Sequence, residues 1–264
     1  KSYINPIETW KTNLMGTLNI LECLRLIKNN CSAVIITSDK AYKNLEISRG
    51  YKENDLLGGI DPYGASKSAA EIVIQSHIKS FFSKNKNNVK ISVARAGNVV
   101  GGGDWSKNRL VPDCMRSCLK NKKVLIRNPN STRPWQHVLE VINGYLTLAL
   151  NLKRKQKFHG EAFNFGPSLR TKKKVKDVVN KMKKNWNRLM WKEVKTKNFF
   201  ENKLLQLDSR KSKKQLKWKS VLTFDETIEL TVDWYKNFFE KKKSTIEKSL
   251  IQIEQYEKKI RSLM

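Results

Sequence analysis

Two short stretches of the sequence carry side chains that could act together on a sugar or alcohol hydroxyl. The first is Ser38-Asp39-Lys40, directly after an apolar run, and the second holds Tyr63 and Lys67 in "DPYGASKSAAE". The spacing i, i+4 puts Tyr63 and Lys67 on one helix face. A free tyrosine has a pKa of about 10, and a neighbouring ammonium lowers it by favouring the phenolate. The pair is therefore a candidate base, although such a pair can also lie unused on a helix surface.

A sheet and two helices are needed to hold these residues. Apolar residues recur at helical spacing over residues 6–29, and residues 63–83 predict a second helix. The apolar runs at 33–37 and 89–96 are typical of strands buried on both faces, and a polar loop at 44–62 joins the first run to the second helix. The order helix, strand, helix, strand predicts an α/β fold with a doubly wound parallel sheet.

The rest of the chain predicts a smaller mixed segment with shorter elements. We expect helices at about 109–121, 137–152 and 173–186, and strands at 124–127, 162–165 and 189–194. A further helix starts at Phe224, and the Lys-rich tail 241–264 is helical and amphipathic. Its heptad pattern is too short for a coiled coil.

Charge and hydropathy limit the classes of partner. The 264 residues carry a net charge of +29 and a mean hydropathy of −0.59. The basic residues are spread along the chain and accompany no helix-turn-helix, zinc-finger or RNP signature, so we read them as solvated faces and expect no specific nucleic-acid binding. No apolar run approaches the roughly 20 residues of a membrane span. We expect a cytoplasmic protein without a membrane partner.

The cysteines and histidines predict no metal site. Cys114 and Cys118 share a helical face, but neither a histidine nor a second cysteine pair completes a ligand set. We expect reduced thiols there and at Cys23 and Cys31. The histidines likewise have no metal partner, which favours structural roles for His77 and His159.

The setting of the Ser and Tyr-x-x-x-Lys residues resembles the extended branch of the short-chain dehydrogenase/reductase superfamily. In that family a Ser or Thr at a strand end and Tyr-x-x-x-Lys on the next helix form a hydride-transfer site with NAD. Within its nucleotide-sugar epimerase/dehydratase members, the chain is similar to the CDP-glucose 4,6-dehydratase branch over residues 1 to about 240. The segments that carry this resemblance are "NPIETWKTNLMGTLNILE", "TSDKAY", "GGIDPYGASK", "ARAGNVVGGGDW", "RLVPDC" and "IRNPNSTRPWQHVLE".

The resemblance assigns roles in a redox step. Tyr63 deprotonates the sugar 4-hydroxyl while hydride leaves C4 for NAD, and Ser38 donates a hydrogen bond to the same oxygen. Lys67 holds the nicotinamide ribose and lowers the pKa of Tyr63, and Ala96 contacts the cofactor. The resulting 4-ketone acidifies the proton on C5.

The resemblance also assigns an elimination step, in which water leaves across C5–C6 and hydride returns to C6. Asp39, if protonated, is the acid for the departing hydroxyl. At the position of Lys40, the larger dehydratase family has a Glu that acts as the base. The CDP-glucose branch has a lysine there, as this chain does. We expect Lys40 to take the C5 proton, which requires that its amine be desolvated or crowded by positive charge.

Four residues are assigned to the nucleotide-sugar substrate by matching motifs. Asn98, Arg109 and Arg133 hold the diphosphate, since a planar guanidinium fits phosphate bidentately, and His137 lines the pocket. A surface ion pair is the alternative for each arginine. The "GGGD" at 101–104 is not a G-x-G-x-x-G fingerprint, and we expect a flexible loop on the substrate side.

The resemblance implies a partial Rossmann-type fold whose first strands and dinucleotide fingerprint precede this chain. Residues 1–103 then form the C-terminal part of the NAD-binding domain, 104–240 mainly bind the nucleotide sugar with some returns to the Rossmann core, and 241–264 are an extension. We expect the chain alone to bind NAD weakly or not at all and to be inactive. A homodimer through the helices at 6–29 and 63–83 is also implied.

Two other functions stay open on the sequence. One is another NAD-dependent nucleotide-sugar dehydratase or epimerase, because no residue that reads the nucleotide base follows from spacing. The other is a non-catalytic fragment or basic binding protein that retains relic motifs.

Overall fold

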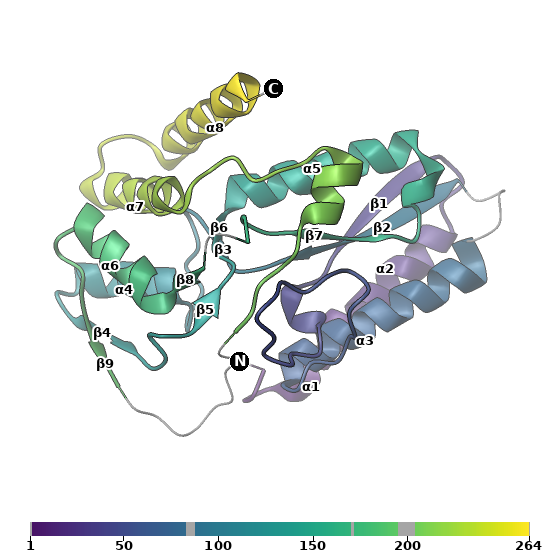
Figure 1. The fold of residues 1–264 in the computed structure, drawn as a ribbon, viewed down its shortest axis with the longest axis horizontal. Helices are drawn as coiled ribbons and strands as arrows, with labels where there is room; N and C mark the ends of the chain where they lie inside the picture. The colour runs from purple at the N-terminus through teal and green to yellow at the C-terminus, as the bar shows by residue number, and fades with distance from the viewer. Residues whose placement is uncertain (1, 83–87, 170–171, 195–203, 264) are drawn as a thin grey trace. The chain divides into compact units, whose positions relative to one another are not determined.

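The computed structural model describes residues 2–82, 88–169, 172–194 and 204–263, and the chain divides into two compact units (Figure 1). Unit 1 comprises Lys1–Gly97, Asn143–Leu169 and Leu205–Lys219. Unit 2 comprises Asn98–Ile142, Arg170–Leu204 and Ser220–Met264. The chain therefore passes between the units several times, and helix α5 (Val138–Arg154) begins in unit 2 and ends in unit 1.

Unit 1 is built on a three-stranded parallel sheet, which confirms the expected α/β class. Strands β1 (Cys31–Ile36), β2 (Val89–Ala96) and β7 (Ala162–Phe165) lie in the order β1-β2-β7. Burial on both faces is correct for β2, of which all residues except Lys90 are buried. It is wrong for β1, because β1 is at the edge of the described sheet and its Ile36 is 50% exposed.

Helices cover both faces of this sheet (Figure 1). On one face lie α1 (Pro6–Trp10) and α2 (Gly16–Arg25), joined by a π-helical turn, and α3 (Pro62–His77), which a π-helical turn extends to Phe82. On the other lies the C-terminal part of α5. The strands alternate accordingly: Ala33 and Ile35 pack toward α2 and α3, and Val34 toward α5. This is the doubly wound arrangement that the element order predicted.

Unit 2 has a separate apolar core made by helices and one short parallel strand pair. Its longer elements are α4 (Leu110–Leu119), β4 (Lys123–Ile126), α6 (Val175–Asn185), β9 (Met190–Glu193), α7 (Phe224–Glu240) and α8 (Thr245–Ser262). The sequence did not predict four two-residue strands, which pair as β3 (Val99–Val100) with β6 (Gln136–His137) and β5 (Thr132–Arg133) with β8 (Lys173–Lys174).

Candidate functional site

The end of β1 turns its polar residues into a compact hydrogen-bonded group. Ser38 caps the 3-10 turn Asp39–Ala41: its hydroxyl accepts from the Lys40 amide at 3.2 Å and donates to Oδ1 of Asp39 at 3.0 Å. Ser38 and Asp39 are 8% and 2% exposed, whereas the Lys40 side chain is exposed. The group lies at the carboxyl ends of the strands, where parallel α/β sheets bind ligands.

The first turn of α3 packs directly on this strand end. Asp61 caps the helix by accepting hydrogen bonds from the amides of Tyr63 at 3.0 Å and Gly64 at 3.2 Å. Gly64 permits the close approach, since a Cβ there would lie 2.9 Å from the Lys40 carbonyl oxygen. The contact brings Nζ of Lys40 to 5.7 Å from the centroid of the Tyr63 ring, within cation–π range.

Lys67 follows one helical turn after Tyr63 and is half-buried. Burial lowers the pKa of Lys67, and the carboxylate of Glu71, a further turn along α3, opposes that change. Tyr63, Lys67 and Glu71 therefore form a row along one side of the helix. Tyr63 and Lys67 supply polar groups of the kind that can bind the ribose of a nicotinamide nucleotide, and the small Ala96 is buried at the end of β2.

A buried ionic network lies beneath the strand end, and the sequence reasoning missed it. Arg95 of β2 binds both carboxylate oxygens of Glu71 at 2.7 Å, and the Thr37 hydroxyl donates to Glu71 at 2.5 Å. Arg95 also donates to the Tyr42 hydroxyl at 2.8 Å, which in turn donates to Asn164 at 2.8 Å. A signal was present, because an arginine inside the apolar strand "VKISVARA" requires a buried partner.

Tyr145 of α5 is a second residue near this group that the sequence did not single out. Its ring meets Phe165 edge-on, with centroids 5.7 Å apart. Burial raises the pKa of Tyr145, and the charges of Asp39 and Tyr63 raise it further, so its phenol lies in the field of both residues. Only the tertiary fold brings α5 here, and no local spacing in the sequence indicates it.

In unit 2, three of the residues assigned to substrate occur on one pair of short strands or beside it. The Asn98 carbonyl accepts from the Gln136 amide at 3.0 Å, just before β3 pairs with β6. His137 is paired with Val100, and Arg133 lies just ahead of β6 and donates to the Thr132 carbonyl at 2.7 Å. The pairing of β3 with β6 thus brings Asn98 and His137 together, whereas Arg133 belongs to β5 and pairs with Lys173 of β8.

His137 presents an unsatisfied donor. Its Nδ1 accepts from the Leu139 amide at 3.3 Å, so the neutral ring carries its hydrogen on Nε2. That nitrogen is buried and has no hydrogen-bond partner among the described residues. Burial lowers the pKa of His137 to about 4, which keeps the ring neutral at physiological pH. It is therefore available as a neutral donor to a ligand oxygen.

The glycine stretch at 101–104 is packed rather than free, which corrects the expectation of a flexible loop. A Cβ at Gly102 would lie 2.1 Å from the indole of Trp234 on α7, and the Tyr235 hydroxyl donates to the Asp104 carbonyl at 2.6 Å. Arg109, which follows this stretch just before α4, is exposed and pairs with the Asp104 carboxylate at 3.2 Å. A phosphate would compete with Asp104 for this arginine.

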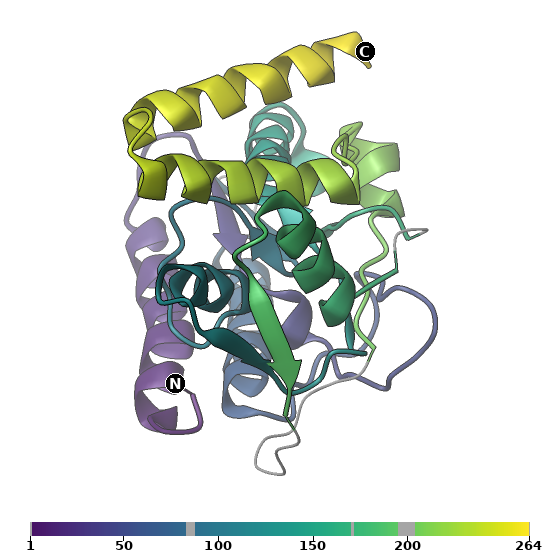
Figure 2. The same ribbon diagram turned by 90° about the vertical axis from the view of Figure 1, so that its left-hand side faces the viewer.

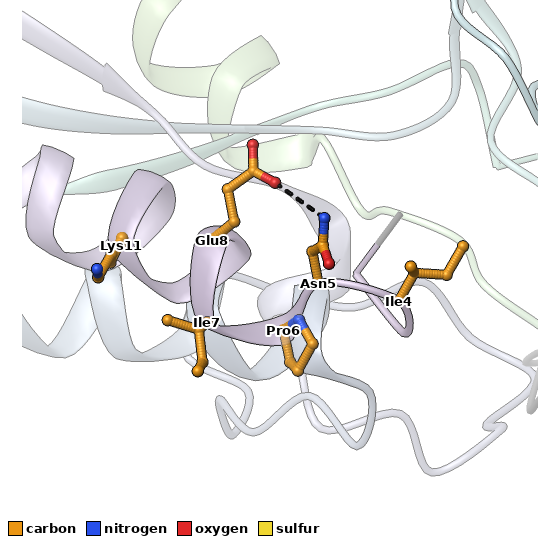
Figure 3. A pocket seen from close by; sticks show the side chains of 6 residues that line it. All are labelled: Ile4, Asn5, Pro6, Ile7, Glu8 and Lys11. Atoms are coloured by element: carbon orange, nitrogen blue, oxygen red, sulfur yellow. Dashed lines mark hydrogen bonds between the residues drawn. The ribbon is translucent and has the colours of Figure 1, made fainter.

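Elsewhere in the described chain we find one surface hollow that none of the assigned residues lines. A hollow at the start of α1 is lined by residues that include Ile4, Pro6 and Lys11, and none of the assigned residues contributes to it (Figure 3). Within residues 2–82, 88–169, 172–194 and 204–263, no cluster of His, Cys, Asp and Glu side chains could hold a metal ion. No helix in those ranges is both long and apolar enough to cross a bilayer.

Comparisons with known proteins identify the family. The family model described as GDP-mannose 4,6 dehydratase matches residues 1–231. CDP-glucose 4,6-dehydratase of Salmonella typhimurium (strain LT2) is 43% identical over 239 residues, which cover 89% of this chain and 67% of that protein.

Two solved structures share the fold, at identities that support the fold alone. UDP-glucuronic acid 4-epimerase from Bacillus cereus, crystallised with UDP-glucuronic acid and NAD, matches with a TM-score of 0.74 and 21% identity. dTDP-glucose 4,6-dehydratase from Bacillus anthracis, crystallised with NAD, matches with a TM-score of 0.71 and 22% identity. Each match covers 86% of this chain and 68% of the other.

Proposed function

This chain belongs to the GDP-mannose 4,6 dehydratase family, and on that premise we propose that it carries the catalytic residues of an NAD-dependent dehydratase that converts CDP-glucose to CDP-4-dehydro-6-deoxyglucose. The 43% identity to the Salmonella enzyme supports CDP-glucose as the substrate. The observation that carries the chemistry is the packing of the Tyr63 turn on the strand end of Ser38, Asp39 and Lys40.

In the redox step, Tyr63 takes the proton of the sugar 4-hydroxyl. Lys67 supports the phenolate by its charge and binds the nicotinamide ribose, and Ala96 leaves room for the ring. The Ser38 hydroxyl, which donates to Asp39 in this structure, turns to donate to the substrate oxygen. A bound NAD would supply the hydride acceptor for C4 and the hydride donor for C6.

In the elimination step, the acid and the base come from adjacent residues. Asp39 gives a proton to the departing C6 hydroxyl, and Lys40 takes the proton from C5. Because the Lys40 side chain is exposed, the desolvation that a neutral amine needs must come from the bound sugar.

The substrate diphosphate is held by Asn98, Arg109 and Arg133. Arg109 exchanges the carboxylate of Asp104 for a phosphate oxygen, which is a better charge match at an exposed position. The buried Nε2–H of His137 donates to a polar atom of the nucleotide sugar. The four free cysteines are consistent with a reducing, cytoplasmic location.

A homodimer through α1–α2 and α3 is part of this proposal. Exposed apolar side chains on and beside these helices support it: Ile7 of α1 and Ile4, in the turn before it, line the hollow at the start of α1 (Figure 3). The others include Met15, Ile20 and Ile72. Light scattering tests it: a dimer mass that falls to the monomer in Ile7→Lys supports the surface, and a monomeric wild type contradicts it.

The substrate assignment is tested in a chimera in which this chain replaces the segment of the Salmonella enzyme that it matches. CDP-, dTDP-, UDP- and GDP-sugars are incubated with the chimera and NAD, and products are identified by mass spectrometry. We expect loss of water from CDP-glucose and unchanged dTDP-, UDP- and GDP-sugars. An isomer of unchanged mass would instead indicate an epimerase.

A further inference from the structure

Helix α8 lies outside the residues that the family model matches, yet it is firmly attached to unit 2. It packs along α7 (Figure 2). The Trp234 indole donates to the Ser249 hydroxyl at 2.9 Å, and the Gln252 amide donates to the Leu230 carbonyl at 2.8 Å. Ion pairs join Lys248 with Asp233 and Lys259 with Glu226.

A first path leads from α8 to the glycine stretch. The Ser249 hydroxyl accepts the hydrogen bond of the Trp234 indole Nε1–H. Gly102 packs against the face of the same indole. Tyr235, the next residue on α7, holds the Asp104 carbonyl. Residues 102–104, which lead into Arg109, thus contact Trp234 and Tyr235, and Trp234 is itself bonded to α8.

A second path leads from α8 to β6. The Tyr256 hydroxyl donates to Oε2 of Glu140 at 2.9 Å. The other oxygen of this buried carboxylate accepts from the Ser220 hydroxyl at 3.1 Å and from the Val221 amide at 2.7 Å. Glu140 follows His137 by three residues, at the start of α5. Tyr256 therefore supports the segment that carries the His137 donor.

We propose that α8 is a positioning element of the nucleotide-sugar site, which holds the Gly101–Arg109 stretch through Trp234 and the His137 segment through Glu140. The inference rests on the proposed function, since that function makes Arg109 and His137 substrate residues. It gives the C-terminal extension a role in substrate affinity rather than in the chemistry of Tyr63 and Lys40.

Three variants of the full chain test the two paths by calorimetric titration with CDP-glucose. Ser249→Ala removes the acceptor of Trp234, Tyr256→Phe removes the donor to Glu140, and the third variant combines them. Each removes one hydrogen bond between α8 and the rest of unit 2, and Ser249→Ala also removes the bond of the Ser249 hydroxyl to the Thr245 carbonyl of its own helix. We expect about three- to tenfold weaker binding for either single change and a larger loss for both. Ser249→Thr, which keeps a hydroxyl, restores affinity.

Ser262→Ala is the matched control, because the Ser262 hydroxyl bonds only to the Lys259 carbonyl of its own helix in the hydrogen bonds described here. We expect it to bind like the wild type. A wild type that binds CDP-glucose, with Ser249→Ala and Tyr256→Phe binding equally well, would overturn the inference alone. A wild type that does not bind CDP-glucose would contradict the proposed function and this inference together.

Hydrogen exchange without ligand tests whether α8 stabilises these two segments, independently of its effect on substrate binding. We expect faster exchange over residues 101–109 in Ser249→Ala and over 136–142 in Tyr256→Phe, with unchanged exchange over β2. Unchanged exchange in both segments would refute the claim that α8 stabilises them, whatever the binding result. Faster exchange with undiminished CDP-glucose affinity would refute the link between α8 and the substrate.

Discussion

Lys40 is the residue on which the proposed chemistry makes the greatest physical demand. It must lose its proton to act as a base, yet its side chain is exposed in this structure and its Nζ lies over the Tyr63 ring. Neighbouring positive charge or desolvation by substrate can favour the neutral amine. Asp39, by contrast, is already buried and fixed by Ser38.

The base role of Lys40 predicts a selective defect. In the chimera, Lys40→Met should lower deuterium exchange at C5 by about 10²-fold or more, as expected for the loss of a general base. Oxidation at C4 should persist, because Tyr63 and Lys67 are unchanged. Exchange at C5 equal to that of the unmodified chimera would rule out Lys40 as the base.

The buried pair of Glu71 and Arg95 predicts a non-additive effect on stability. Glu71→Gln leaves an uncompensated buried guanidinium and should lower the free energy of unfolding by about 3–5 kcal/mol. Adding Arg95→Met removes that charge and should recover much of the loss. Denaturant unfolding of the two single variants and the double variant measures this, and strictly additive losses would argue against the pair.

His137 predicts a pH dependence of stability. Its pKa in the folded chain is about 4, below the ordinary value of 6.5. Between these values the unfolded chain binds a proton that the folded chain does not, so stability falls as the pH drops from 6.5 to 4, by about 3 kcal/mol. His137→Gln should lack this contribution, while His159 remains in both proteins. Identical pH profiles of the unfolding free energy would contradict the buried neutral ring.

At the scale of elements, the position of α3 depends on a glycine. In Gly64→Ala the new methyl group would meet the Lys40 carbonyl oxygen at 2.9 Å and the Gly59 Cα at 3.1 Å. We expect a loss of about 1–3 kcal/mol in unfolding free energy. Gly16→Ala is the matched control, since its nearest neighbour would be 3.9 Å away, and it should stabilise the helix by about 0.5–1 kcal/mol. Equal effects of the two substitutions would show that α3 does not depend on this contact.

The elements that the sequence predicted well are those with long, regular apolar patterns. Strand β2 was expected at 89–96 and is Val89–Ala96, and β7 was likewise expected at its observed residues. The two-residue strands β3 and β6 were missed because they are shorter than any periodic pattern. The first helix was expected to reach residue 29 but ends at Arg25, and β1 begins at Cys31, two residues before its apolar run.

The candidate site was predictable where its residues are close in sequence. Ser38, Asp39 and Lys40 are adjacent, and Tyr63 and Lys67 share a helix face, so local reasoning reached them. Glu71 was one turn beyond and could have been inferred from the charge of Arg95 in a buried strand. Tyr145 depends on the tertiary placement of α5, which no spacing in the sequence records.

At the scale of the whole molecule, the sequence contains no G-x-G-x-x-G motif. Tyr63 and Lys67 are assigned to the nicotinamide end of NAD, and no motif of this chain is assigned to its adenosine end. We expect calorimetric titration of NAD into the chain to show binding weaker than the micromolar range. Micromolar binding would contradict this expectation.

The most direct test of the central claim is the mass of the product that the chimera makes from CDP-glucose and NAD in heavy water. We predict a product that has lost one water, carries one deuterium at C5 and retains the C4 hydrogen at C6. A product of unchanged formula epimerised at C4, or unchanged CDP-glucose recovered from a folded chimera that binds NAD, would contradict the account.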